Sequence, residues 1–112
     1  SELGLAALLD ISVGTGAISV AMQSGALASV PRQLALEFAH PAFAERDQLL
    51  PLHLSQPDAE GNPVWSGHFV TVPQGRWYVT LRSGDDWRVS GEWQGEAQLT
   101  LRPAGGDHVN GR

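Results

Sequence analysis

The chain of 112 residues contains no cysteine and no lysine, and it has a single methionine. Without cysteine there is no disulfide, no thiolate metal site and no cysteine nucleophile. No apolar run approaches the roughly 20 residues of a membrane-spanning helix, and no signal-peptide pattern is present. The chain has seven arginines and twelve acidic residues, which gives a net charge of −5. The sequence therefore lacks the basic stripe that is typical of a nucleic-acid-binding protein.

What remains is enough apolar material for one packed core. Hydrophobic residues make up 42% of the chain, and thirteen glycines and seven prolines are spread along its whole length. Glycine and proline spread in this way indicate frequent turns, which are typical of many short strands rather than a few long helices. We expect residues 1–102 to form a single β-sandwich domain and residues 103–112 a disordered C-terminal tail.

Period-two alternation marks the strands of the first half. Within 32–40, Leu34, Leu36 and Phe38 share one face, and polar or small residues take the other. Leu50, Leu52 and Leu54 alternate around Pro51, and because proline lacks a ladder donor we place this strand at an edge or a bulge.

The second half reads as strands joined by tight turns. Alternating runs begin at Trp65, Trp77, Trp87 and Ala97, and we expect them to form an antiparallel meander. Seven or eight short strands at intervals of roughly 10 residues are typical of a two-sheet, immunoglobulin-like antiparallel β-sandwich. The fold class predicted is therefore all-β.

Five side chains are conceivable ligands for a soft or borderline metal: Met22, His40, His53, His68 and His108. None are spaced as a local metal motif, so only the fold could assemble a site. His40 continues the apolar face of its strand and precedes Pro41. The simplest interpretation is a histidine that caps the strand end by a backbone hydrogen bond, and Met22 is explained as core filling.

Aromatic and acidic residues offer two further candidate sites. Trp65, Trp77 and Trp87 lie in phase with the apolar residues of their strands, which indicates core packing, whereas Trp93 beside a turn is expected to be exposed at one end of the sandwich. The pair Asp85-Asp86 lies in a tight turn, where aspartates bond their own backbone, and the spacing of a calcium loop is absent.

No pattern of an enzyme is found. The chain has neither a G-x-S-x-G elbow nor a glycine-rich phosphate loop. We therefore predict a non-catalytic protein with no catalytic and no cofactor-binding residues; the residues of any metal site remain unknown at this point.

Four of the seven arginines recur at outward positions of the second half, namely Arg76, Arg82, Arg88 and Arg102. If they line up across one sheet, they form a surface for a protein partner. Ordinary solvation of an outer sheet face explains the same pattern and is the simpler interpretation.

Several segments together resemble the FixH family. The first runs from Leu34 to Pro41, written LALEFAHP, and continues as AERDQL from Ala44. The second is GRWY at 75–78, followed by DWRVSG at 86–91, and the opening Leu-Gly-Leu at 3–5 is similar to the family's stretch before its β domain. The family's threonine after the histidine-proline pair is Ala42 here, which puts any role of that hydroxyl in doubt.

The resemblance implies a periplasmic β domain tethered to the bacterial inner membrane by one N-terminal helix outside this chain. It implies a role beside a copper-transporting P-type ATPase in the assembly of cbb3-type cytochrome c oxidase, so the expected partner is a membrane protein. The chain is then the β domain without its anchor. No cofactor is expected, although copper remains possible.

Two alternatives stay open. The first is a periplasmic copper-binding sandwich domain with His40 and Met22 as ligands, although one methionine is a thin supply for a copper carrier. The second is a carbohydrate-binding module, which needs at least two tryptophans exposed on a common face.

Overall fold

The computed structural model describes residues 4–24, 29–69, 71–84 and 87–103, and these form an all-β domain. The alternating sequences produce eight strands and one 3₁₀ turn, η1. Their bounds are β1 Ala6–Ser12, β2 Ala17–Ser24, β3 Gln33–Ala39, η1 Ala44–Arg46, β4 Gln48–Leu54, β5 Val64–His68, β6 Trp77–Ser83, β7 Trp87–Trp93 and β8 Gln98–Leu101.

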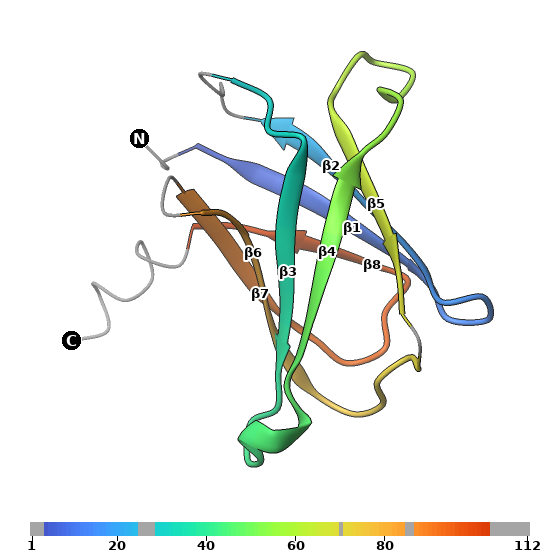
Figure 1. The fold of residues 1–112 in the computed structure, drawn as a ribbon, viewed down its shortest axis with the longest axis vertical. Coiled ribbons are helices and arrows are strands. Elements are labelled where there is room, and N and C mark those ends of the chain that lie inside the picture. Colours follow the sequence, from blue (N-terminus) through green and yellow to red (C-terminus); the bar gives the residue numbers. More distant parts are fainter. Residues whose placement is uncertain (1–3, 25–28, 70, 85–86, 104–112) are drawn as a thin grey trace.

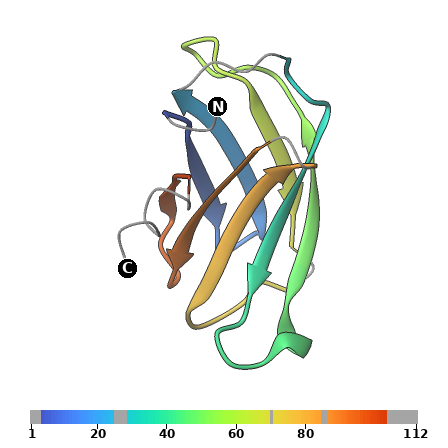
Figure 2. The ribbon, with the colours of Figure 1, turned by 90° about the vertical axis from the view of Figure 1, so that its left-hand side faces the viewer.

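The strands form one antiparallel sheet in the order β7-β6-β3-β4-β5-β2-β1-β8. This sheet folds back on itself into two layers, β7-β6-β3-β4 and β5-β2-β1-β8 (Figures 1 and 2). The layers are joined on one side by only two residue pairs between β4 and β5, and on the other by the bridge Ser90↔Arg102. The result is a sandwich that is nearly closed as a barrel.

The distribution of strands confirms the immunoglobulin-like prediction. The first, second and fifth strands lie in one layer, and the third, fourth, sixth and seventh lie in the other, as in Greek-key sandwiches of this type. The eighth strand is added beside β1. The predicted meander is confirmed only for β6 and β7, which pair with each other. It is wrong for the other two strands, because β5 pairs with β2 and β4 rather than with β6, and β8 pairs with β1.

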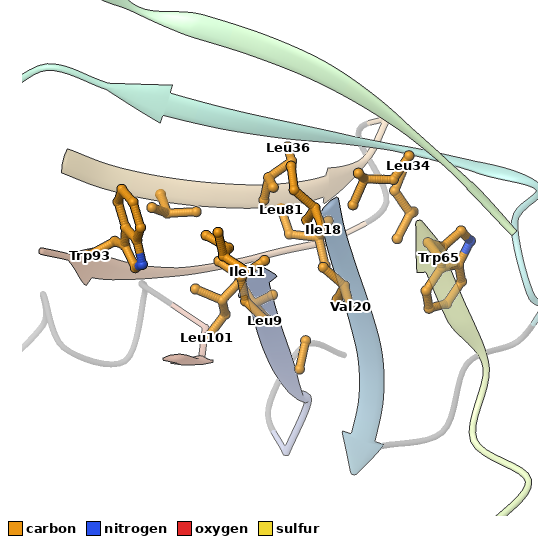
Figure 3. Close-up of a cluster of buried hydrophobic side chains, with 14 of the residues drawn as sticks. Leu9, Ile11, Ile18, Val20, Leu34, Leu36, Trp65, Leu81, Trp93 and Leu101 are labelled. Atoms are coloured by element: carbon orange, nitrogen blue, oxygen red, sulfur yellow. The ribbon is translucent and has the colours of Figure 1, made fainter. Parts of the chain in front are cut away.

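The core lies between the two layers. Apolar side chains point inward from both, with Leu34, Leu36 and Leu81 facing Leu9 and Ile18 across the interior (Figure 3). Phe38 packs edge-on against the rings of other buried residues, with centroids 5.0 Å from Phe69 and 5.6 Å from Trp93. Among the described residues no polar or charged side chain is buried. Burial of apolar surface therefore holds the layers together.

Strand β4 differs from the prediction in its position. It lies inside the strand order, between β3 and β5, and not at an edge. Its ladder with β5 covers only His53 and Leu54, so Pro51 pairs with Ala35 on β3 and lies beyond that ladder. Pro51 has no backbone N–H to donate, and no residue pair of the β4–β5 ladder requires one from it.

The connections lie at two opposite ends of the sandwich. The start of β1 and the loops around Asp58 and Gly84 lie at one end, and the β3–β4 connection with η1 lies at the other (Figure 1). Within the described residues, no helix has the length and hydropathy to cross a bilayer. Of the predicted tail, 103–112, all residues after Pro103, His108 among them, fall outside the described residues, as do Asp85-Asp86.

Candidate functional site

The His40 turn is the first candidate site and joins β3 to β4. The Nδ1 atom of His40 accepts hydrogen bonds from the backbone N–H groups of Ala42 and Phe43, each at 3.0 Å. The backbone N–H of His40 donates to Oδ1 of Asp47 at 2.8 Å. Two side chains thus satisfy three backbone donors at a strand end, where the ladder can no longer do so. The predicted cap is confirmed.

Aromatic contacts fix the same turn. The His40 ring packs edge-on against Trp77, with centroids 4.9 Å apart, and lies 5.3 Å from the ring of Phe43. Phe43 is 48% exposed, and the guanidinium of Arg46 lies over its ring at 5.2 Å. The turn is therefore a rigid tip that presents one phenylalanine to solvent.

These contacts argue against His40 as a metal ligand. With Nδ1 accepting two hydrogen bonds, the proton of the neutral ring is on Nε2, so neither nitrogen is free to bind copper without breaking the turn. Met22 is buried on β2, where its N–H donates to the carbonyl of Pro63, at the end of the sandwich opposite to His40. The two proposed copper ligands are not brought together.

The other histidines do not supply a site either. His53 and His68 are exposed, and Nε2 of His68 lies 3.1 Å from the carbonyl oxygen of Thr15. In the part of the chain that the structure describes, no three His, Asp or Glu side chains gather closely enough to hold a metal ion. The described residues therefore do not fit a copper centre.

The tryptophans belong to the core. Trp65 and Trp77 are buried as predicted, and Trp87 is half-buried and packs against the same cluster. The prediction that Trp93 is exposed is wrong: it is 1% exposed, and its Nε1–H donates to the carbonyl of Glu96 at 2.7 Å. The turn folds back over the indole and satisfies its polar atom. No pair of exposed tryptophans exists to stack on a sugar.

The second candidate site is the outer face of the β7-β6-β3-β4 layer, here called the outer face. Arg82 and Arg88 lie directly opposite each other on β6 and β7, so both side chains point to this side. Arg102 follows β8 of the other layer and forms a bridge with Ser90, two residues after Arg88 on β7. Arg76 lies farther along, where its Nε donates to Glu92 at 2.9 Å.

The charges on this face are unevenly balanced. Arg76 donates to the hydroxyl of Tyr78 and pairs with Glu92, and both contacts raise the pKa of Arg76 above its ordinary value. Arg82 reaches Glu37 only at 3.9 Å. Arg88 has no ion pair with any residue that the structure describes. Of the four arginines predicted to line up, Arg82 and Arg88 are therefore direct neighbours, and Arg76 is neutralised by its own partner.

Apolar side chains are exposed on the same face. Leu49 on β4 is 62% exposed, and Tyr78 on β6 is 46% exposed. A groove of about 380 Å³ runs over β3 between Arg82 on one side and Leu49 and Pro51 on the other. An exposed apolar surface beside charged groups is typical of a protein-interaction site.

The sequence analysis assigns no role to Phe43, Asp47 or Leu49, although the last two lie in AERDQL, one of the segments that carry the family resemblance. The alternation of Leu50, Leu52 and Leu54 puts Leu49 on the opposite face of the strand, and the register Glu37↔Leu49 agrees with this placement. Asp47 follows the histidine by seven residues, and its bond to the backbone of His40 gives no local signal. The exposed Phe43 lay within a connector to which no role was given.

The loop before β5 is a local structure of its own. The carboxylate of Asp58 accepts hydrogen bonds from the backbone of Asn62 and of Glu60 and from the Asn62 amide. The backbone bond from Asn62 is the main cause that lowers the pKa of Asp58. This loop is a turn held by its own aspartate.

Comparison with known proteins adds one match. The model of the FixH family matches residues 1–94, which contain the whole seven-strand frame β1–β7 and end before β8. No curated protein and no solved structure matches the chain at a significant level. Since the match covers most of the 112 residues, the chain belongs to the FixH family.

Proposed function

We propose that this chain is the periplasmic domain of a membrane-anchored accessory protein that binds a membrane-protein partner during assembly of a cbb3-type cytochrome c oxidase. Membership of the FixH family supports an accessory, non-catalytic role in oxidase assembly at the level of the family. The role beside a copper-transporting P-type ATPase is part of the proposal. An accessory role of this kind requires a protein-binding surface rather than a reaction centre.

The outer face carries the proposal. It combines the exposed Leu49 and Tyr78 with the facing arginines Arg82 and Arg88 on a rigid sheet. Rigid apolar anchors bordered by arginine are what protein interfaces use, because they lose little conformational freedom on binding. The His40 turn adds the exposed Phe43 at the end of the same layer.

Copper delivery by this domain itself has less support. Met22, the one sulfur ligand, is buried at the end of the sandwich opposite to His40. The Nδ1 atom of His40 already accepts two backbone hydrogen bonds within its turn. We therefore assign copper handling to the partner, and the domain's contribution to binding and positioning that partner.

The proposal can be tested in a bacterium that lacks its own FixH-family protein. The full chain is exported behind a membrane-spanning helix, and assembled cbb3 oxidase is measured by haem staining of membrane complexes. The tethered chain should restore the complex, whereas the same chain retained in the cytoplasm serves as the control. A tethered, folded chain that restores nothing contradicts the proposed role.

A further inference from the structure

The groove on the outer face has a cationic side and an apolar side. Arg82 lies on one side, and Leu49, Leu50 and Pro51 of β4 lie on the other. Ala35 lies between them, paired with Arg82 on β6 and with Pro51 on β4. Because its side chain is a single methyl group, the sheet is hollow at this row, and the groove of about 380 Å³ is the consequence.

The arginine pair beside this groove is unfavourable for the fold. Like charges directly opposite each other on antiparallel strands repel, and Arg82 and Arg88 are such a pair. Glu37 lies 3.9 Å from Arg82, which is too far for a strong hydrogen-bonded contact, and Arg88 pairs with no described residue. An anion between the two guanidinium groups would relieve this repulsion.

We propose that this groove binds an extended segment of a partner protein in which acidic side chains adjoin leucine-like apolar ones. The carboxylates lie between Arg82 and Arg88, and the apolar side chains cover Ala35 and pack on Leu49 and Pro51. Charge complementarity supplies the first contact, and burial of the exposed leucine supplies the second. The inference rests on the proposed function, because it gives the chemistry of the partner that this function needs.

An anionic lipid surface fits the groove less well. The chain carries a net charge of −5, so an anionic bilayer repels the domain as a whole. The described groove offers one arginine in its lining and a second beside it, and each contributes only about 1 kcal/mol at a membrane surface. A peptide segment places its few carboxylates next to the arginines and does not expose the rest of the acidic domain to an extended negative surface.

The binding test uses the full chain and a labelled heptapeptide, Leu-Ser-Glu-Leu-Glu-Ser-Leu, with the Glu→Gln peptide as its control. Amide NMR shifts on titration should change around Ala35 and Arg82 and be lost with Arg88→Glu, with affinity reduced at least about tenfold. Ser66→Asp/Thr100→Asp makes the same charge change on the opposite layer and should bind as the unaltered chain does. Equal binding of the Gln peptide, shifts elsewhere, or tighter binding to phosphatidylglycerol vesicles would overturn the proposal.

A stability measurement separates this inference from a merely structural arginine pair. Arg88→Glu replaces a repulsive pair by an attractive one, so the urea midpoint of unfolding should rise while peptide binding is lost. A lower midpoint would mean that the pair is already neutralised within the chain and would overturn the proposal. If the peptide fails to bind while the partner still co-purifies through the outer face, the segment chemistry is wrong and the proposed function is retained.

Discussion

His40 illustrates how a single side chain can look functional in sequence and be structural in the fold. Its ring accepts two backbone N–H groups through Nδ1, and its own N–H is held by Asp47. The strand end needs these partners because the chain leaves the ladder there. The histidine-proline segment that carries the family resemblance is therefore the device that shapes the tip and exposes Phe43.

Replacement of His40 tests this role. His40→Ala removes the acceptor of both N–H groups and the contact with Trp77, so the free energy of unfolding should fall by about 1–2 kcal/mol. His40→Asn keeps an oxygen near the position of Nδ1 and should retain most of the hydrogen-bond contribution. Urea denaturation followed by tryptophan fluorescence measures both. Equal stability of His40→Ala and the unaltered chain would show that the turn does not depend on the ring.

At the same scale, burial of tryptophan was predictable only in part. The phase of Trp65 and Trp77 with their apolar neighbours indicates burial, and both indoles donate to loop carbonyls, of Pro31 and Gln74. Trp93 shares the phase of Val89 but lies beside a glycine turn, which suggested exposure. The carbonyl of Glu96 that satisfies it belongs to the turn itself, and a linear reading cannot place that oxygen over the ring.

At the scale of elements, alternation locates the strands but not their partners. The period of two over 33–39 and 77–83 identifies β3 and β6, and the structure pairs them although more than 30 residues lie between. A meander was the simplest order for the second half, yet β5 crosses to the other layer to pair with β2. Pairing depends on contacts between distant segments, which no local pattern encodes.

Strands β4 and β5 pack closely around Gly67. A Cβ atom added at Gly67 would lie 2.6 Å from Cδ2 of Leu52 and 3.0 Å from the carbonyl oxygen of Pro51. Leu52 is fully buried, so its side chain has no free space to move into. The glycine is therefore required by close packing rather than by backbone conformation.

Gly67→Ala should lower the free energy of unfolding by about 1–3 kcal/mol, because an overpacked core shifts side chains and backbone together. Gly14→Ala is the matched control, since nothing lies within 4 Å of its added Cβ atom. Chemical denaturation of the two variants provides the comparison. A Gly67→Ala variant as stable as Gly14→Ala would show that the β4–β5 junction is looser than described.

At the scale of the whole molecule, the two candidate copper ligands are separated by the fold. Met22 ends up near Pro63 at one end of the sandwich, and His40 is at the tip of the β3–β4 connection at the other (Figure 1). Sequence reasoning could name both residues but not the distance between them. Only the antiparallel layout shows that they cannot share an ion.

A Cu(I) competition titration against a coloured chelator tests this separation. We expect the same copper uptake by the unaltered chain, Met22→Ala and His40→Asn, because none of the three has a site that joins the two residues. One equivalent bound tightly by the unaltered chain and lost in either variant would contradict this account and restore the copper-carrier alternative.

The central claim is that the outer face binds the membrane partner, and co-purification tests it most directly. The tethered chain is compared with Leu49→Asp/Arg82→Gln on the outer face and with Ser66→Asp/Thr100→Asp, an equal charge change on the opposite layer. The copper-transporting P-type ATPase and the oxidase subunits are identified in the purified complexes by mass spectrometry. The account predicts their loss from the outer-face variant alone; their equal recovery with all three chains would contradict it.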